Sequence, residues 1–134
     1  MRLLFSCAIV ASAALVLGGP AGAGAARTQV HLAPLNGSGE TATATLVQRA
    51  DGSLLVTVLT THGGSVPQPV HIHKGTCTDG GAVAYKLENA VHGRSVTTLK
   101  DVKLSDLQSH ASVINIHKSK AEMGTYVACG PITT

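Results

Sequence analysis

Runs of alternating apolar and polar residues recur along the chain, and clusters of turn residues separate them. From Thr41 to Gln48, hydroxyl and apolar side chains alternate with period two, a pattern typical of a strand with one buried face. The step Asp51-Gly52 leads into a second β-rich run, Ser53 to Thr61, and a D-G step between two such runs predicts a hairpin. The other expected strands are 28–35, the segment around His71 and His73, 82–87, 95–99, 112–117 and 125–129.

The expected strands are five to nine residues long and lie between Gly, Pro and Asp turns. Short strands at such spacing are typical of antiparallel sandwiches and barrels. The sequence therefore predicts an all-β domain, an antiparallel Greek-key β-sandwich or flattened barrel of about eight strands. One turn at 104–107 is the only helix expected, and no internal repeat or second domain is predicted.

The first 26 residues have the pattern of a secretory signal peptide. Arg2 supplies a short positive segment, Leu3 to Leu17 are apolar, and Gly18 to Pro20 and small residues follow. The apolar run is too short to cross a bilayer comfortably. We therefore expect residues 1–26 to be removed and residues 27–134 to form one domain. The protein would then be secreted or periplasmic, without a membrane anchor.

The remaining composition argues against nucleic acid as a partner. Without Arg2 the chain has nine basic and seven acidic residues, and no basic run occurs. Beyond the signal segment the only aromatic residues of the Phe, Trp and Tyr class are Tyr85 and Tyr126, too few for a base-stacking surface. No catalytic carboxylate pair, Walker-type glycine loop or Ser-His-Asp pattern is found.

Loss of the signal segment also removes Cys7, which leaves Cys77 and Cys129. An even pair of cysteines in an exported protein is typical of a disulfide. We therefore expect Cys77 and Cys129 to be bonded to each other.

Two histidines one residue apart, His71 and His73, project from the same face of the strand expected around them. In the later run 113–117, Asn115 and His117 share a face in the same way. A disulfide between the two cysteines would bring these regions together, so that His71, His73 and His117 converge on one metal ion. Three imidazoles suit copper best among the common metals.

The alternative is that His71 and His73 are solvent-facing side chains of an edge strand. The four other histidines are expected on the solvent face of a strand or in solvated loops: His31, His62, His92 and His110. His92 is the candidate fourth copper ligand, because it follows the loop that carries Cys77.

Four segments resemble the copper/zinc superoxide dismutases and occur in the same order as in that family. They are H-I-H at 71–73, C-T-D-G-G at 77–81, I-N-I-H at 114–117 and G-T-Y-V-A-C-G-P-I at 124–132. The family's counterparts are H-V-H, C-T-S-A-G, V-V-H-E and G-S-R-L-A-C-G-V-I. The N-terminal half agrees only in its pattern of strands and turns, and the general outline is also similar to the CHRD domain.

The resemblance implies a superoxide-dismutase-like fold. It also implies that His71, His73 and His117 are copper ligands. Cys77 and Cys129 match the two cysteines of the family's disulfide.

The chain differs from the family at two positions where the family has functional residues. Val83 follows the C-T-D-G-G loop where the family has its metal-bridging histidine, and no zinc-binding segment follows, so zinc is not expected. Tyr126 falls on the position of the family's anion-guiding arginine, and a phenol has no permanent positive charge. Lys74 and Lys118 each directly follow a candidate ligand and could supply some of the positive field that attracts an anion.

The function implied is an exported copper-binding protein, and a copper-only superoxide dismutase acting on superoxide if the copper is redox-active. Two alternatives stay open. One is a non-catalytic periplasmic copper chaperone or buffer. The other is a metal-free interaction module of the CHRD-like type, in which the disulfide is structural and the histidines lie on the surface.

Overall fold

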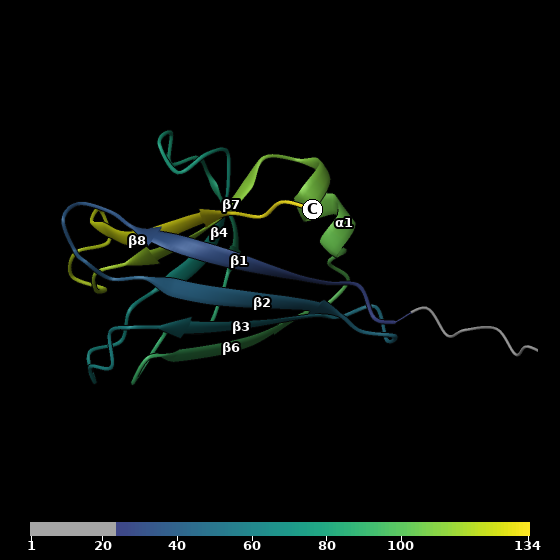
Figure 1. Ribbon diagram of the computed structural model, residues 1–134, viewed down its shortest axis with the longest axis horizontal. Coiled ribbons are helices and arrows are strands. Elements are labelled where there is room, and N and C mark those ends of the chain that lie inside the picture. Colours follow the sequence, from purple (N-terminus) through teal and green to yellow (C-terminus); the bar gives the residue numbers. More distant parts are fainter. Residues whose placement is uncertain (1–23) are drawn as a thin grey trace, which may run out of the picture.

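The computed structural model describes residues 24–134 (Figure 1). It contains eight strands and one short helix, in the order β1 (Arg27–Pro34), β2 (Ala42–Gln48), β3 (Leu54–Thr60), β4 (Val70–Lys74), β5 (Val83–Lys86), β6 (Arg94–Leu99), α1 (Leu104–Ser109), β7 (Ser112–His117) and β8 (Tyr126–Pro131). Most of the expected signal peptide, residues 1–23, lies outside the described residues.

The eight strands form one curled antiparallel sheet in the order β5-β4-β7-β8-β1-β2-β3-β6. β1 lies between β8 and β2 (Figure 1). Its residues 27–32 pair with β2, whereas Ala33 and Pro34 pair with β8. β1 therefore joins the half of the sheet made of β2, β3 and β6 to the half made of β8, β7, β4 and β5.

The hairpin expected at Asp51-Gly52 connects β2 to β3. The Asp51 carboxylate accepts hydrogen bonds from the backbone N–H and the hydroxyl of Ser53, at 2.9 and 2.6 Å. Gly52 has a φ of 83°, a value that glycine adopts without the steric cost that a Cβ brings. The turn residues therefore fix the register in which Gln48 lies opposite Leu54.

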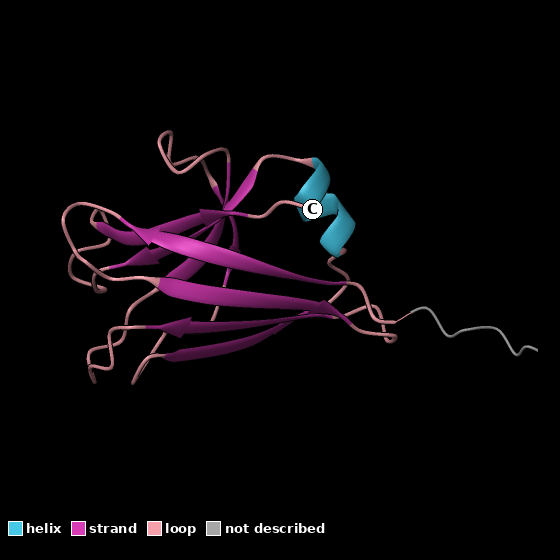
Figure 2. Cartoon of the chain, viewed as in Figure 1, coloured by secondary structure: helices cyan, strands magenta, loops and turns pink. Residues whose placement is uncertain are grey.

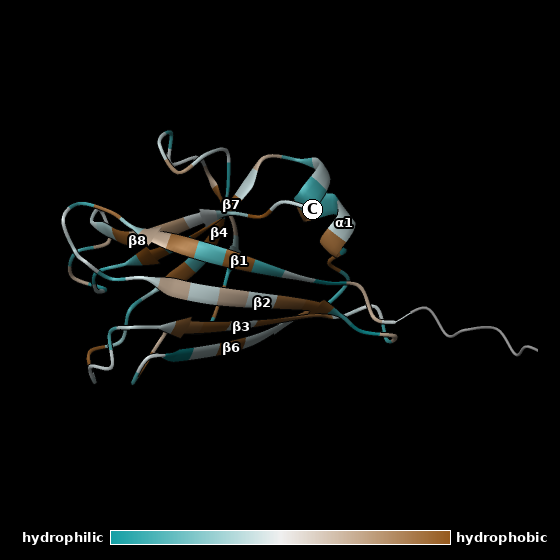
Figure 3. Ribbon diagram, viewed as in Figure 1, coloured by the Kyte–Doolittle hydropathy of each residue, from teal (hydrophilic) through white to brown (hydrophobic). Residues whose placement is uncertain are grey.

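One hydrophobic core serves both halves of the sheet. In β2 and β3, buried apolar residues alternate with partly exposed ones, as period two requires. Figure 3 shows the same kind of alternation along β1, where brown and teal bands follow one another. Fully buried Ile72, Ile114 and Ile116 come from the other half and belong to the same cluster as Leu46 and Val56. The sheet curls because its two halves bury their apolar faces against each other.

The predicted all-β class, antiparallel pairing and number of strands are confirmed. The Greek-key and superoxide-dismutase-like detail stays a prediction. α1 is the single helix in residues 24–134 (Figure 2). It extends the expected turn by two residues and buries Leu104 and Leu107. No helix in this part of the chain is long and apolar enough to cross a membrane.

Candidate metal centre

The three candidate ligands come from two neighbouring strands that are buried on both faces. In β4, Val70 and Ile72 belong to the core cluster, so period two places His71 and His73 on the other face. His71 lies opposite Asn115 of β7, and His117 shares the face of Asn115. Antiparallel pairing of β4 with β7 thus brings all three histidines to one side of the sheet.

This side of the sheet is covered. His71, His73 and His117 are only 6, 3 and 3% exposed. Loop 75–82 contacts His73 through the Gly81 carbonyl, and loop 118–125 contacts His117 through the Met123 carbonyl. β4 is also an internal strand, because β5 and β7 flank it. The alternative of solvent-facing histidines on an edge strand is therefore wrong.

The imidazoles of His71, His73 and His117 form a compact group. Each offers one ligand atom, and these atoms all lie within 4.8 Å of one another. The His71 and His117 ring centroids are 4.7 Å apart, and His73 lies 5.7 Å from the first and 5.8 Å from the second. Nε2 of His117 and Nδ1 of His71 are 3.0 Å apart. The convergence expected from the sequence is therefore found in the structure.

Backbone carbonyls orient two of the three rings. Nδ1 of His73 donates to the Gly81 carbonyl at 2.8 Å, and Nδ1 of His117 donates to the Met123 carbonyl at 2.6 Å. Because a carbonyl only accepts, it holds the proton on Nδ1 and leaves Nε2 of a neutral ring as the acceptor. Nε2 of His73 is buried and has no hydrogen-bond partner. Such second contacts fix the tautomer and direction of metal-binding histidines in proteins.

The environment favours the neutral form of two of these imidazoles, His71 and His117. Burial, followed by the nearby His117, His73 and Lys86, lowers the pKa of His71 from 6.5 to about 4. Burial also lowers the pKa of His117, partly opposed by its hydrogen bond to the Met123 carbonyl. A metal ion binds imidazole only in its neutral form. The site is therefore ready to bind a cation near neutral pH without first releasing protons from His71.

The predicted disulfide is confirmed: the sulfur atoms of Cys77 and Cys129 are 2.06 Å apart. Cys129 of β8 lies opposite Asn115, so it shares the face that carries the histidines. The bond ties loop 75–82 to β8 across this face. The cysteines therefore hold in place the loop whose carbonyl orients His73.

Loop 75–82 approaches β4 so closely that one position needs glycine. A Cβ built on Gly81 would lie 1.8 Å from the carbonyl oxygen of Lys74, which is far inside contact distance. The N–H of Lys74 in turn donates to the Ala82 carbonyl at 2.9 Å. Gly81 therefore makes possible the close approach that brings its own carbonyl to His73.

Tyr126 lies beside the imidazoles. It starts β8 opposite His117, at an irregularity in the β7–β8 register. Its ring centroid is 4.7 Å from that of His117 and 5.9 Å from that of His73. The position that the resemblance assigns to an arginine is thus adjacent to the histidine group, occupied by a partly buried aromatic ring.

The candidate fourth ligand, His92, is not part of the group. It is exposed in the turn between β5 and β6, where its backbone N–H donates to the Gly64 carbonyl at 2.9 Å. His31, His62 and His110 are also exposed, as expected.

Three further residues shape the site and were not predicted from the sequence to be part of it. Gly81 and Met123 act through their backbone carbonyls, which every residue has. Asn115 is 1% exposed beside His71, and its Oδ1 is buried without a hydrogen-bond partner. A buried polar residue between apolar neighbours in V-I-N-I-H was the one signal available for Asn115.

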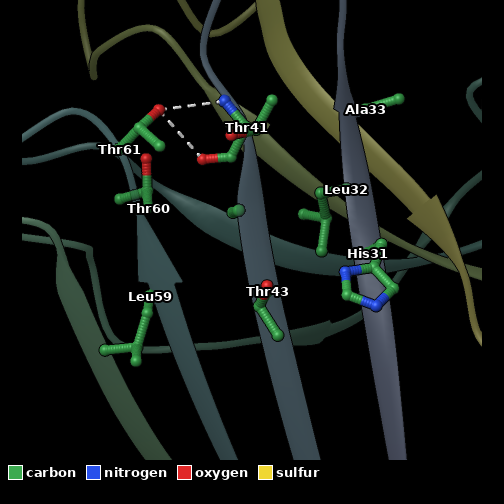
Figure 4. A pocket seen from close by; sticks show the side chains of 9 residues that line it. His31, Leu32, Ala33, Thr41, Thr43, Leu59, Thr60 and Thr61 are labelled. Atoms are coloured by element: carbon green, nitrogen blue, oxygen red, sulfur yellow. Dashed lines mark hydrogen bonds between the residues drawn. The ribbon is translucent and has the colours of Figure 1, made fainter.

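A shallow groove on the outer face of β1, β2 and β3 contains another histidine (Figure 4). His31, Thr43 and Leu59 lie side by side across it, because they are register neighbours. At one end the Thr61 hydroxyl accepts from the Thr41 N–H and donates to its carbonyl, at 3.0 and 3.1 Å. His31 is the only ligating side chain among the residues that line the groove, so a second metal centre is not formed there.

Comparison of the chain with protein-family models, with curated proteins and with solved structures found no match.

Proposed function

We propose that this is an exported copper-binding protein in which His71, His73 and His117 hold one copper ion. The proposal rests on one observation: three buried imidazoles lie together, with their ligand atoms within 4.8 Å of one another. A buried nitrogen without a partner, such as Nε2 of His73, costs free energy. A metal ion held by all three rings removes that cost.

The donor set favours copper. It consists of three imidazole nitrogens, and no carboxylate or thiolate belongs to the group. Magnesium and calcium prefer oxygen ligands, and both cysteines near the site are used in the disulfide. Among the divalent metals that imidazole binds, affinity reaches its maximum at Cu²⁺. Zinc also accepts three histidines, so a zinc titration is the natural comparison.

The resemblance to copper/zinc superoxide dismutases extends the proposal to a copper-only dismutase that acts on superoxide. An anionic substrate is drawn in by fixed positive charge. Lys118 is paired with Glu122 at 2.9 Å, and Tyr126 carries no charge where the family has arginine. These two observations favour a second candidate function, a non-catalytic copper chaperone or buffer.

Copper titration of the purified protein tests the binding site. We expect one equivalent of Cu²⁺ to bind, more tightly than Zn²⁺. His71→Gln and His117→Gln should each weaken binding by about 100-fold or more, because each removes one of three ligands. His31→Gln is the matched control, since His31 is an exposed histidine of β1 outside the group, and it should bind copper like the wild type.

Thermal unfolding of each variant shows that it is folded before binding is compared. Wild-type binding no stronger than that of His71→Gln would overturn the copper proposal and leave a metal-free interaction module, one whose three central histidines are buried and not on the surface. A superoxide-decay assay on the copper-loaded protein then separates the two copper functions. Decay faster than with the same concentration of free copper supports a dismutase, and decay no faster supports a chaperone or buffer.

A further inference from the structure

The Tyr126 ring packs against two of the three imidazoles, those of His73 and His117, and is itself partly exposed. His73 and His117 are each 3% exposed, whereas Tyr126, in contact with both rings, is partly exposed. Tyr126 packs edge-on to His73, with an angle of 88° between the ring planes, and tilted against His117 at 55°. It is thus a partly exposed neighbour of two buried histidines.

The Tyr126 ring also lies against loop 75–82. A Cβ built on Gly80 would be 3.6 Å from both the hydroxyl oxygen and the Cε2 atom of Tyr126. This loop is tied down twice, by the disulfide from Cys77 and by the Gly81 carbonyl that accepts from His73. The ring therefore lies close to both His117 of β7 and a cross-linked loop, and moving it aside would break its contacts with both.

We propose that Tyr126 is the gate of the copper site: its ring must move before copper or a bulky copper-binding molecule can pass. The inference rests on the proposed copper site and concerns its rates of exchange. Tyr126 contributes to the kinetic barrier for copper exchange, whereas the three imidazoles supply the free energy of copper binding. Removal of the ring therefore changes how fast copper enters and leaves while the equilibrium affinity stays nearly the same. The ring keeps chelators and copper-carrying proteins away from the copper ion, whereas ligands the size of water can still reach it.

The test is the rate at which excess EDTA removes Cu²⁺ from the loaded protein, followed by stopped-flow absorbance. Tyr126→Ala should release copper at least about tenfold faster than the wild type, because the ring no longer has to move. Tyr126→Phe keeps the ring and should release copper at the wild-type rate. Tyr85→Phe is a control at the other tyrosine beyond the signal segment. Tyr126→Leu replaces Tyr126→Ala if the smaller side chain prevents folding.

Equilibrium titrations of the same variants separate the gate from the binding site. A tenfold faster release with an affinity within about threefold of wild type supports the gate, since a barrier affects both directions equally. Equal release rates for Tyr126→Ala and the wild type overturn it, and so does an acceleration by Tyr126→Phe that matches Tyr126→Ala. Failure of the wild type to bind one equivalent of copper overturns the proposed function itself, and the gate with it.

Discussion

At the scale of single residues, Gly81 lies closer to a neighbouring backbone than a side chain would allow. In Gly81→Ala the new Cβ would meet the Lys74 carbonyl at 1.8 Å, so the loop must move away and take the acceptor of His73 with it. We expect copper affinity to fall by about 10- to 100-fold, the usual effect of losing a contact that orients a ligand. Copper titration measures the fall.

Gly63→Ala is the matched control, because a Cβ at Gly63 meets no atom within 4 Å. Its copper affinity should equal that of the wild type. If Gly81→Ala bound copper as tightly as the wild type, the Gly81 carbonyl would not be needed to orient His73.

The low pKa of His71 predicts how the stability of the metal-free protein depends on pH. The pKa of this residue is about 4 in the folded protein and 6.5 in the unfolded chain. Between these values the unfolded chain binds the extra proton, so the free energy of unfolding falls as the pH is lowered from 6.5 to 4. The loss reaches on the order of 3 kcal/mol over the whole window.

Urea unfolding at a series of pH values measures this loss. His71→Leu should remove much of the dependence, because the group that takes up the proton is gone. A wild-type protein equally stable at both ends of the window would contradict the expectation.

The sequence predicted the ligands better than their surroundings. Period two places His71 and His73 on one face whatever the rest of the chain does, so the H-x-H spacing was informative. The contacts that orient His73 and His117 come from the backbone carbonyls of Gly81 and Met123. Every residue has a backbone carbonyl, so the sequence does not mark these two. The contacts can be identified only once the positions of the two loops are known.

At the scale of elements, the strands were recognisable from the local sequence, but their pairing was not. The boundaries of β2, β3 and β7 lie within one residue of the expected runs. That β1 is shared between β8 and β2 depends on contacts between residues distant in sequence, such as Ala33 with Cys129. Local periodicity does not encode such partners, and the resemblance alone suggested how the second half of the chain is arranged.

Loop 75–82 is the element whose position depends most on a covalent bond. The double variant Cys77→Ser, Cys129→Ser removes a link between residues 52 apart in sequence. Loop-closure entropy then predicts a loss of about 4 kcal/mol of unfolding free energy. Urea unfolding measures it, with the dithiothreitol-treated wild type as an independent comparison. A loss below about 1 kcal/mol would show that the unfolded chain is not appreciably restricted by the bond.

At the scale of the whole molecule, the metal site and the rest of the sheet should unfold together. The histidines lie in β4 and β7, whereas β2, β3 and β6 form the other half of the sheet. β1 pairs with both halves, and one apolar cluster contains residues from each. Neither half can separate without exposing that cluster, so the chain is expected to unfold in one cooperative transition.

Copper should therefore stabilise residues that lie far from it. With free copper at 100 times its dissociation constant, binding adds about 2.7 kcal/mol to the free energy of unfolding. For a domain of this size the melting temperature should rise on the order of 10 °C in calorimetry, as a single shifted peak. His117→Gln should show no such shift, and His31→Gln should show the full one. Two peaks, of which copper moves only one, would mean that β1 does not couple the two halves of the sheet.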